Sequence, residues 1–299
     1  MHRLRTLIPL WLALAAWIRP CIVRGQSSPL IEKTTVSLHT SAKPAVCGES
    51  MTGESVKAAF RLVCLGERGR SGGITVRNAI IIGFVGGLVR RDDVKHPEVQ
   101  FAEYLRQTYP STVHAEVFAN HDGKHALRRV LQLLDTNGDG VLAPSEKEQA
   151  SIIIYGHSWG ASQVIILARE LEGLDIPVLL TVQVDSVHKP GHEDAVIPPN
   201  VRSAVNFYQT KGVIHGRPQV RASDPRRTTI IGNFKMTYED RRINCDNYPW
   251  IARHLNKPHH EIENDPLVWK QIASMIDSEL SKSTAAVEAS FTSTSLGMK

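Results

Sequence analysis

Apolar residues along the chain form short continuous runs that alternate with amphipathic segments. The first run, residues 79–85, is apolar throughout, which is typical of a strand buried on both faces of a sheet. The segment Pro97–Tyr109 instead carries Val99, Phe101 and Leu105 on one side, which predicts an amphipathic helix. The same alternation continues, with strands predicted at 112–118, 151–155, 178–184 and 202–208, and helices at 124–134, 160–171 and 266–280.

This regular alternation of strands and helices predicts an α/β fold class. Strand–helix–strand units place parallel strands side by side, so we expect a mainly parallel central sheet with helices on both faces. The pattern occupies residues 76–282. Before it, residues 26–75 are rich in serine, threonine, lysine and glycine and are interpreted as an N-terminal extension. After it, residues 283–299 are small and polar, which predicts a disordered tail.

The first 25 residues follow the pattern of a secretory signal peptide. Arg3 and Arg5 precede an apolar run at residues 7–18, and small residues appear by Gly25. The run is short for a membrane span. We therefore expect a signal peptide at residues 1–25 and a secreted or periplasmic protein, with an uncleaved membrane anchor as the alternative.

The composition adds little to this picture. With 299 residues, 42% of them hydrophobic and 22% charged, the chain has enough apolar material for a sizeable core. The net charge is +5, but the basic residues are scattered and not interleaved with aromatic residues, so we expect no nucleic-acid partner. Export permits disulfides. Only Cys47, Cys64 and Cys245 follow the signal peptide, which is too few for a disulfide scaffold and leaves the connectivity open.

One serine lies between two glycines, in the sequence Gly-His-Ser-Trp-Gly at 156–160, between a predicted strand and a predicted helix. This context predicts a turn so tight that Ser158 adopts a strained backbone and exposes its hydroxyl. The start of the following helix directs backbone N–H groups at the serine oxygen, so the N–H of Trp159 is one expected oxyanion donor. A second donor is expected near Gly86 and Gly87, in the loop after the first strand.

A serine becomes nucleophilic when a base takes its proton, and an acid in turn orients that base. His259, in a polar loop before the last helix, is the preferred base, and its neighbour His260 is the alternative. The acid is expected at the carboxyl end of a strand between the serine and the histidine. Asp185 is preferred because it directly follows a predicted strand, while Asp224 and, third, Asp194 are the alternatives.

These features together resemble the α/β-hydrolase superfamily, and within it the lipase- and esterase-like members. The resemblance rests on the Gly-His-Ser-Trp-Gly turn, on Gly-Phe-Val-Gly-Gly-Leu at 83–88, and on an aspartate and a histidine that follow in that order. It covers about residues 79–280. It implies an α/β-hydrolase fold and a triad of Ser158, Asp185 and His259, but no particular substrate, since this fold hosts many chemistries.

Residues 135–146 match the twelve-residue EF-hand calcium loop at every ligand position, with glycine at the sixth position. We expect a structural Ca²⁺ here, not needed for the chemistry, because no second loop is present and the following helix can only be short. A metal-free turn rich in Asp, Asn and Gly is the alternative. The expected ligands are Asp135, Asn137, Asp139, the backbone carbonyl of Val141, and Glu146.

The sequence thus predicts an exported serine hydrolase that cleaves carboxylic esters or thioesters through an acyl-enzyme. The expected substrate is a small-molecule or lipid ester, with contact to a membrane surface in the second case. Two alternatives stay open: a catalytically inactive binding protein of the same fold, and an acyltransferase that uses the same triad with an alcohol in place of water. Acyl chain length and oligomeric state are not indicated by the sequence.

Overall fold

The computed structural model describes residues 78–296. The predicted signal peptide at 1–25 and extension at 26–75 lie outside these residues, as do Cys47 and Cys64. Within the described part of the chain, Cys245 is buried and forms no disulfide. No helix in this part combines the length and the hydropathy that a membrane span requires.

Six parallel strands form the central sheet, in the order β2-β1-β3-β4-β6-β8. The two strands β5 (Val196–Ile197) and β7 (Arg221–Ala222) pair separately. This all-parallel sheet confirms the predicted α/β class. The six strands are β1 (Ala79–Val85), β2 (Val113–Ala119), β3 (Ile152–His157), β4 (Val178–Val184), β6 (Val201–Tyr208) and β8 (Thr229–Lys235).

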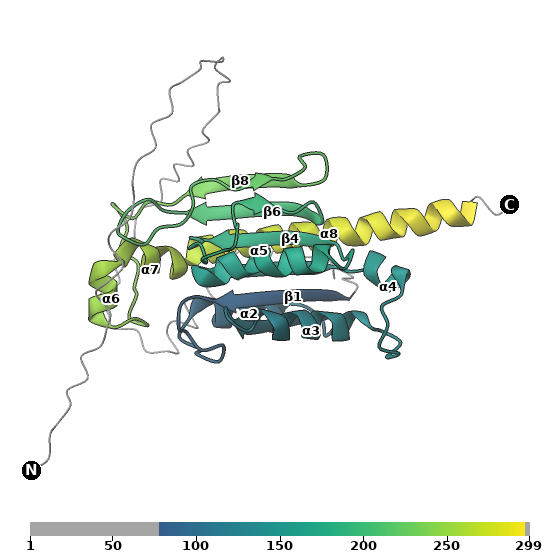
Figure 1. The fold of residues 1–299 in the computed structure, drawn as a ribbon, viewed down its shortest axis with the longest axis horizontal. Helices are drawn as coiled ribbons and strands as arrows, with labels where there is room; N and C mark the ends of the chain where they lie inside the picture. The colour runs from purple at the N-terminus through teal and green to yellow at the C-terminus, as the bar shows by residue number, and fades with distance from the viewer. Residues whose placement is uncertain (1–77, 297–299) are drawn as a thin grey trace, which may run out of the picture. The chain divides into compact units, whose positions relative to one another are not determined.

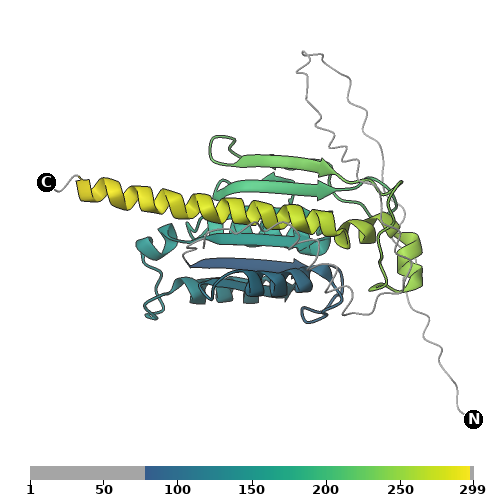
Figure 2. The same ribbon diagram turned by 180° about the vertical axis from the view of Figure 1, so that it is seen from behind.

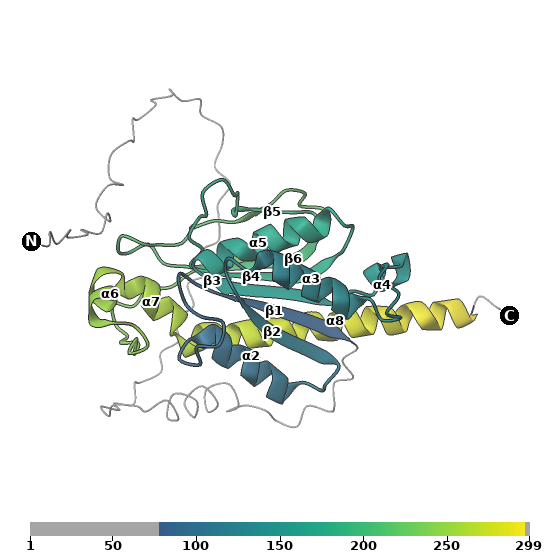
Figure 3. The same ribbon diagram turned by 60° about the horizontal axis from the view of Figure 1, so that its bottom comes forward.

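Helices cover both faces of the sheet, as the sequence predicts. Helices α3 and α5 pack on one face, and α2 and α8 cross the other, which is the near face in Figure 2. Figure 3 shows the two pairs on opposite sides of the strands. The helices are α2 (Pro97–Thr108), α3 (Gly123–Leu134), α4 (Pro144–Glu148), α5 (Trp159–Glu172), α6 (Trp250–Leu255), α7 (Lys257–Glu263) and α8 (Pro266–Leu296).

Alternation along the inner strands divides the core into two layers. In β1, Ile81 packs with Phe101 of α2 and Trp269 of α8, whereas the next residue, Ile82, packs in the layer that contains α3 and α5. All four strands in the middle of the sheet are buried, and Ile81 and Ile82 are fully inaccessible. Each such side chain stabilises the fold by about 1.5–3 kcal/mol. This rigid platform holds the loops at its carboxyl edge in place.

The structure differs from the sequence predictions at several places. Strand β8 is not predicted, because it is a half-exposed edge strand in which Gly232 and Asn233 weaken the pattern of strand-forming residues. Residues 257–263 form the short helix α7 and not a loop. Helix α8 continues to Leu296, through part of the region 283–299 for which the sequence predicts a disordered tail; no glycine or proline interrupts the chain between Pro266 and residue 297.

The two ends of the sheet carry different features. Strands β1, β6 and β8 point toward the end that carries α6 and α7, and the loop before α4 lies at the opposite end (Figure 1). Ligand and catalytic sites of open parallel sheets lie at the carboxyl ends of the strands. A catalytic site is therefore expected beside α7.

Candidate active site

The turn after β3 holds Ser158 in a strained conformation. Its φ of 56° and ψ of −125° place this non-glycine residue outside the common regions, between the end of β3 and the first turn of α5. A Cβ on Gly156 would lie 2.6 Å from the backbone of Gly160, and one on Gly160 would collide with the carbonyl of Phe84. Both glycines are therefore required for the turn to close against its own helix and against β1.

His259 links Ser158 to Asp185. Its Nε2 lies 2.9 Å from the Ser158 hydroxyl, and its Nδ1 lies 2.6 Å from Oδ2 of Asp185. Since a carboxylate only accepts, Nδ1–H donates to Asp185 and Nε2 accepts from the serine hydroxyl. All three side chains are buried. The structure thus brings together the three residues that the sequence places in one triad, from the ends of β3 and β4 and from α7.

Asp185 is held by three donors besides His259. Oδ1 accepts from the backbone N–H of Gln209 at 3.1 Å and of Gly216 at 2.7 Å, and Oδ2 accepts from Nε2 of Gln209 at 2.8 Å. Asp185 itself has a φ of 45°, so the chain turns sharply just after β4. Gly216 cannot carry a side chain, because its Cβ would lie 2.5 Å from Oδ1 of Asp185. These contacts leave the carboxylate one orientation, toward the histidine.

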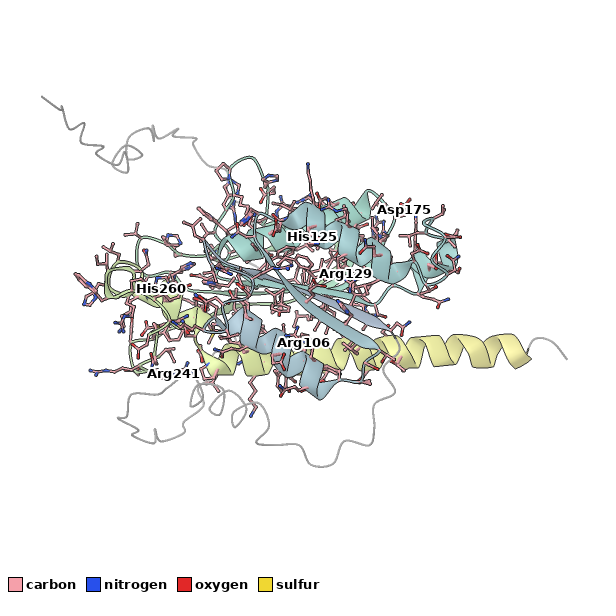
Figure 4. The ribbon with its side chains drawn as sticks, turned by 90° about the horizontal axis from the view of Figure 1, so that it is seen from below. Arg106, His125, Arg129, Asp175, Arg241 and His260 are labelled. Atoms are coloured by element: carbon pink, nitrogen blue, oxygen red, sulfur yellow. The ribbon has the colours of Figure 1, made fainter. Side chains whose placement is uncertain are left out.

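The alternative residues have other partners. His260, labelled in Figure 4, stacks on Tyr248 with 3.7 Å between ring centroids, and burial lowers its pKa to about 4. Asp224 pairs with the exposed Arg226, its own neighbour in sequence, at 3.1 Å. Asp194 accepts from the hydroxyl of Ser186 and from the guanidinium of Arg217. None of these carboxylates or rings is hydrogen-bonded to the candidate triad.

The loop that contains Gly86 and Gly87 lies directly against the serine turn. A Cβ on Gly86 would be 3.0 Å from Cβ of Ser158, so only glycine allows this close approach without a shift. Gly87 has a φ of +46°. Trp159 is the first residue of α5, where backbone N–H groups lack acceptors within the helix. The three residues expected to supply oxyanion donors therefore surround the serine.

A small cavity opens above these residues. Its volume is about 240 Å³, and it is lined by Ser158, His259 and the glycine loop. Leu88, at its edge, is 90% exposed, and Trp159 is 41% exposed. Carbon-rich side chains make up most of the remaining wall: Leu88, Val89, Trp159, Val187, Ile214 and Tyr248.

No sequence pattern marks the residues that brace this site. Lys189 donates from Nζ to the carbonyl of Asn120 at 2.5 Å and to Oε1 of Gln163 at 2.8 Å, and burial lowers its pKa to about 8. Asn120 in turn donates from Nδ2 to the carbonyl of Gly87 at 2.5 Å. Gln209, which holds Asp185, is another. No local pattern marks any of these polar residues, because their partners come from other segments of the chain.

His157, beside the serine, belongs to a buried polar layer beneath the triad. Its ring lies 4.6 Å from the His259 ring between centroids, and burial lowers its pKa to about 4. Its Nδ1 faces the carboxylates of Glu98, at 3.5 Å, and Glu263, at 3.8 Å. His96 pairs with Glu263 at 2.7 Å in the same layer. Glu98 and Glu263 belong to no motif in the sequence.

The loop at residues 135–146 has the turns expected of an EF-hand loop. The carboxylate of Asp135 accepts from the N–H groups of Gly138 and Gly140 at 2.8 and 2.9 Å, and Gly140 has a φ of +79°. Glu146 accepts from the N–H of Thr136 at 2.8 Å. The Asp and Glu side chains of this loop do not form a group of three ligand atoms that all lie within 4.8 Å of one another. Among the described residues, such a group, made of His and Glu side chains, is found in the buried layer beneath the triad.

No protein-family model and no curated protein matches the sequence. Solved structures show a distant likeness. An esterase/lipase from an uncultured bacterium has 10% sequence identity and a TM-score of 0.37, over 80% of this chain and 94% of that chain. An esterase from Pyrobaculum calidifontis has 12% identity and a TM-score of 0.35, over 76% of this chain and 93% of that chain. These similarities are too low to assign a function, so any function must be inferred from the geometry of the site in this chain.

Proposed function

We propose that this protein is a serine hydrolase that cleaves carboxylic esters, with Ser158 as nucleophile, His259 as general base and acid, and Asp185 as the orienting acid. The observation that carries the proposal is the continuous hydrogen-bond chain from the Ser158 hydroxyl through His259 to Asp185, at 2.9 and 2.6 Å. The strained backbone at Ser158 supports it, since strain of this kind is typical of a nucleophile turn.

The proposed reaction starts when Ser158 Oγ attacks the ester carbonyl and His259 Nε2 takes its proton. Asp185 stabilises the imidazolium that forms and keeps Nδ1 protonated, so that Nε2 is the basic nitrogen. Backbone N–H groups at Trp159 and at Gly86–Gly87 bind the developing oxyanion, an effect worth roughly 10²–10³ in rate per donor. The protonated histidine then gives its proton to the leaving alkoxide. Water releases the acyl group from the serine by the same steps in reverse.

The cavity favours an ester with an apolar acyl group. Its wall is largely hydrocarbon, and Leu88 stands exposed at its edge. Such a wall binds an acyl chain by excluding water and offers few polar groups to read a sugar or a peptide. We include both small-molecule esters and lipid esters presented at a membrane surface, and thioesters of the same acyl groups, in the proposed substrate class.

Fluorophosphonate labelling tests the proposal directly. The reagent should label Ser158 in folded protein, and denaturation or the change Ser158→Ala should abolish labelling. The change Ser145→Ala, at an exposed serine of α4, is the matched control and should leave labelling intact. Hydrolysis of short p-nitrophenyl esters should fall by roughly 10³–10⁶ in Ser158→Ala. Equal rates in the two variants would favour a binding protein, and acyl products formed preferentially on added alcohols would favour an acyltransferase.

We also propose that residues 135–146 bind a structural Ca²⁺. The donor set, with side-chain oxygens at Asp135, Asn137, Asp139 and Glu146 and the carbonyl of Val141, is the one a hard cation prefers. The loop lies at the end of the sheet away from α7 (Figure 1), so the ion would take no part in ester cleavage. Isothermal titration with millimolar Ca²⁺ tests this, and the absence of both heat and a shift in Tm would exclude it.

We propose, finally, that the protein is exported, on the evidence of the basic and apolar pattern in its first 25 residues. N-terminal sequencing of the protein recovered from outside the cytoplasm would test this. A mature chain that begins after Gly25 is the expected result. A chain that retains Met1 and stays with the membrane fraction would favour the anchor instead.

A further inference from the structure

Three buried acidic and imidazole groups converge beneath the candidate triad. His96 precedes α2, Glu98 lies in the first turn of α2, and Glu263 is the last residue of α7. One ligand atom from each lies within 4.8 Å of the other two. The side chains of Glu98 and Glu263 are inaccessible to solvent, and that of His96 is 5% exposed. A fourth group, Nδ1 of His157, lies 3.5 Å from Glu98 and 3.8 Å from Glu263.

Much of the bonding capacity of this cluster is unused. Within the described part of the chain, five atoms of the cluster lack a hydrogen-bond partner. They are both carboxylate oxygens of Glu98, both ring nitrogens of His157, and Oε2 of Glu263. Buried polar groups without partners are rare, because each costs about 1–3 kcal/mol or more when the group is charged. Unsatisfied atoms that face one another from three different elements therefore point to a ligand that completes the cluster.

The charges indicate what that ligand must supply. The carboxylates of Glu98 and Glu263 lie buried beside the rings of His96 and His157. Nδ1 of His96 lies 2.7 Å from Glu263, so a protonated His96 would offset part of the negative charge. Either protons or a cation can neutralise such a cluster. A cation that accepts nitrogen and oxygen ligands together would also satisfy the unused atoms.

We propose that His96, Glu98, Glu263 and His157 bind one divalent transition-metal ion, with Zn²⁺ as the probe of choice. Zinc binds imidazole nitrogen and carboxylate oxygen at about 2.0–2.2 Å in a tetrahedron, so neighbouring ligand atoms lie about 3.3 Å apart. One ligand atom from each of His96, Glu98 and Glu263 lies within 4.8 Å of the other two, and Nδ1 of His157 lies 3.5 Å from Glu98 and 3.8 Å from Glu263. Nδ1 of His96 now forms a 2.7 Å hydrogen bond with Glu263, so this bond must open and the ring of His157 must move inward for all four groups to reach the tetrahedral spacing. Ca²⁺ and Mg²⁺ are disfavoured because they prefer sites made of oxygen alone.

The ion would tie together the elements that carry the triad. Glu263 is four residues after His259 on α7, and His157 immediately precedes Ser158. If Glu263 and His157 both bind an ion that is also bound by residues at the start of α2, the positions of His259 and Ser158 relative to each other become fixed. The ion itself would be separated from the reacting atoms by the rings of His157 and His259, so its role would be structural.

Metal titration of the full chain, stripped with a chelator and kept free of calcium, tests the proposal. Wild-type protein should bind one Zn²⁺ tightly in competition with a chromophoric chelator, and Co²⁺ in its place should show the intense visible bands of a tetrahedral site. The isosteric change Glu98→Gln should weaken binding by roughly a hundredfold or more. Glu103→Gln, at an exposed glutamate of the same helix, is the matched control and should bind as wild type does.

Two results would overturn the proposal. If stripped wild-type protein binds no Zn²⁺ tightly, protons shared between Glu98 and Glu263 neutralise the cluster instead. If Glu98→Gln binds as tightly as wild type, the ion sits on surface histidines. Circular dichroism will report whether Glu98→Gln folds. Should it not fold, the cobalt spectrum of the wild-type protein decides, since weak bands of a six-coordinate ion would exclude this site. Neither readout depends on ester hydrolysis.

Discussion

The two ends of the sheet present two kinds of candidate site. At the carboxyl end, Ser158, Asp185 and His259 come from three elements separated by up to 101 residues, and all are buried. At the opposite end, the twelve consecutive residues 135–146 form a loop whose contacts are almost all internal and exposed. The triad residues come together only when the sheet is folded, whereas the contacts of the loop at 135–146 lie within one short segment of the chain. Damage to the core should therefore affect the first far more than the second.

Among the changes that test this comparison, removing the acid should have the largest effect. Asp185→Asn keeps the shape of the side chain but favours the wrong tautomer of His259, so the rate of ester cleavage should fall roughly 10⁴-fold. Asp224→Asn should cleave esters at the wild-type rate, because Asp224 contacts the exposed Arg226 and not the histidine. Initial rates with a p-nitrophenyl ester measure both.

The reverse outcome would reassign the acid. A large loss in Asp224→Asn with little change in Asp185→Asn would mean that the His259–Asp185 hydrogen bond has no part in the reaction. Circular dichroism of both variants checks that the protein is folded.

The contrast between the two ends also explains what the sequence reveals. Continuous apolar runs predict strands that are buried on both faces, so β1, β3 and β4 are found, while the half-exposed edge strand β8 is not. The serine turn and the calcium-type loop are readable because their geometry is local. Gln209 and the Glu98–Glu263 layer are not, since a polar side chain gains its role from partners that only the fold brings near.

A second prediction tests how tightly the acid is held. Gly216→Ala would place a Cβ 2.5 Å from Oδ1 and 2.6 Å from Cα of Asp185, so the loop or the acid must move. We expect a loss of about 2–4 kcal/mol in the free energy of unfolding and a reduced kcat. Gly173→Ala is the matched control, because its Cβ would meet its nearest neighbour at an ordinary 3.6 Å. Urea denaturation of both variants compares them, and equal stability would argue against close packing at Asp185.

A third, smaller effect concerns Lys189, which braces the glycine loop through Asn120. Burial lowers its pKa from 10.5 to about 8, so above pH 8 the unfolded chain binds a proton that the folded chain has released. The contribution of Lys189 to the free energy of unfolding must therefore increase with pH between about 8 and 10.5. Measured against Lys189→Met, the wild-type protein should gain stability across that window. Lys124→Met, at an exposed lysine, controls for loss of a surface charge. A constant difference across the window would contradict the burial of this charge.

The smallest effect on catalysis should come from the opposite end. Glu146→Gln weakens the last ligand of the proposed calcium loop while keeping an acceptor for the N–H groups of Thr136 and Ala143. Wild-type protein should gain about 5–10 °C in Tm when Ca²⁺ is about a hundredfold above its Kd, and the variant should lose that gain. Ester cleavage below the Tm should change less than about twofold, since the loop touches none of the reacting groups. Glu148→Gln, exposed two residues later, should retain the full Ca²⁺ response. If Glu146→Gln reduces ester cleavage as strongly as it reduces calcium binding, the two ends of the sheet are coupled through β3 and do not act as separate sites.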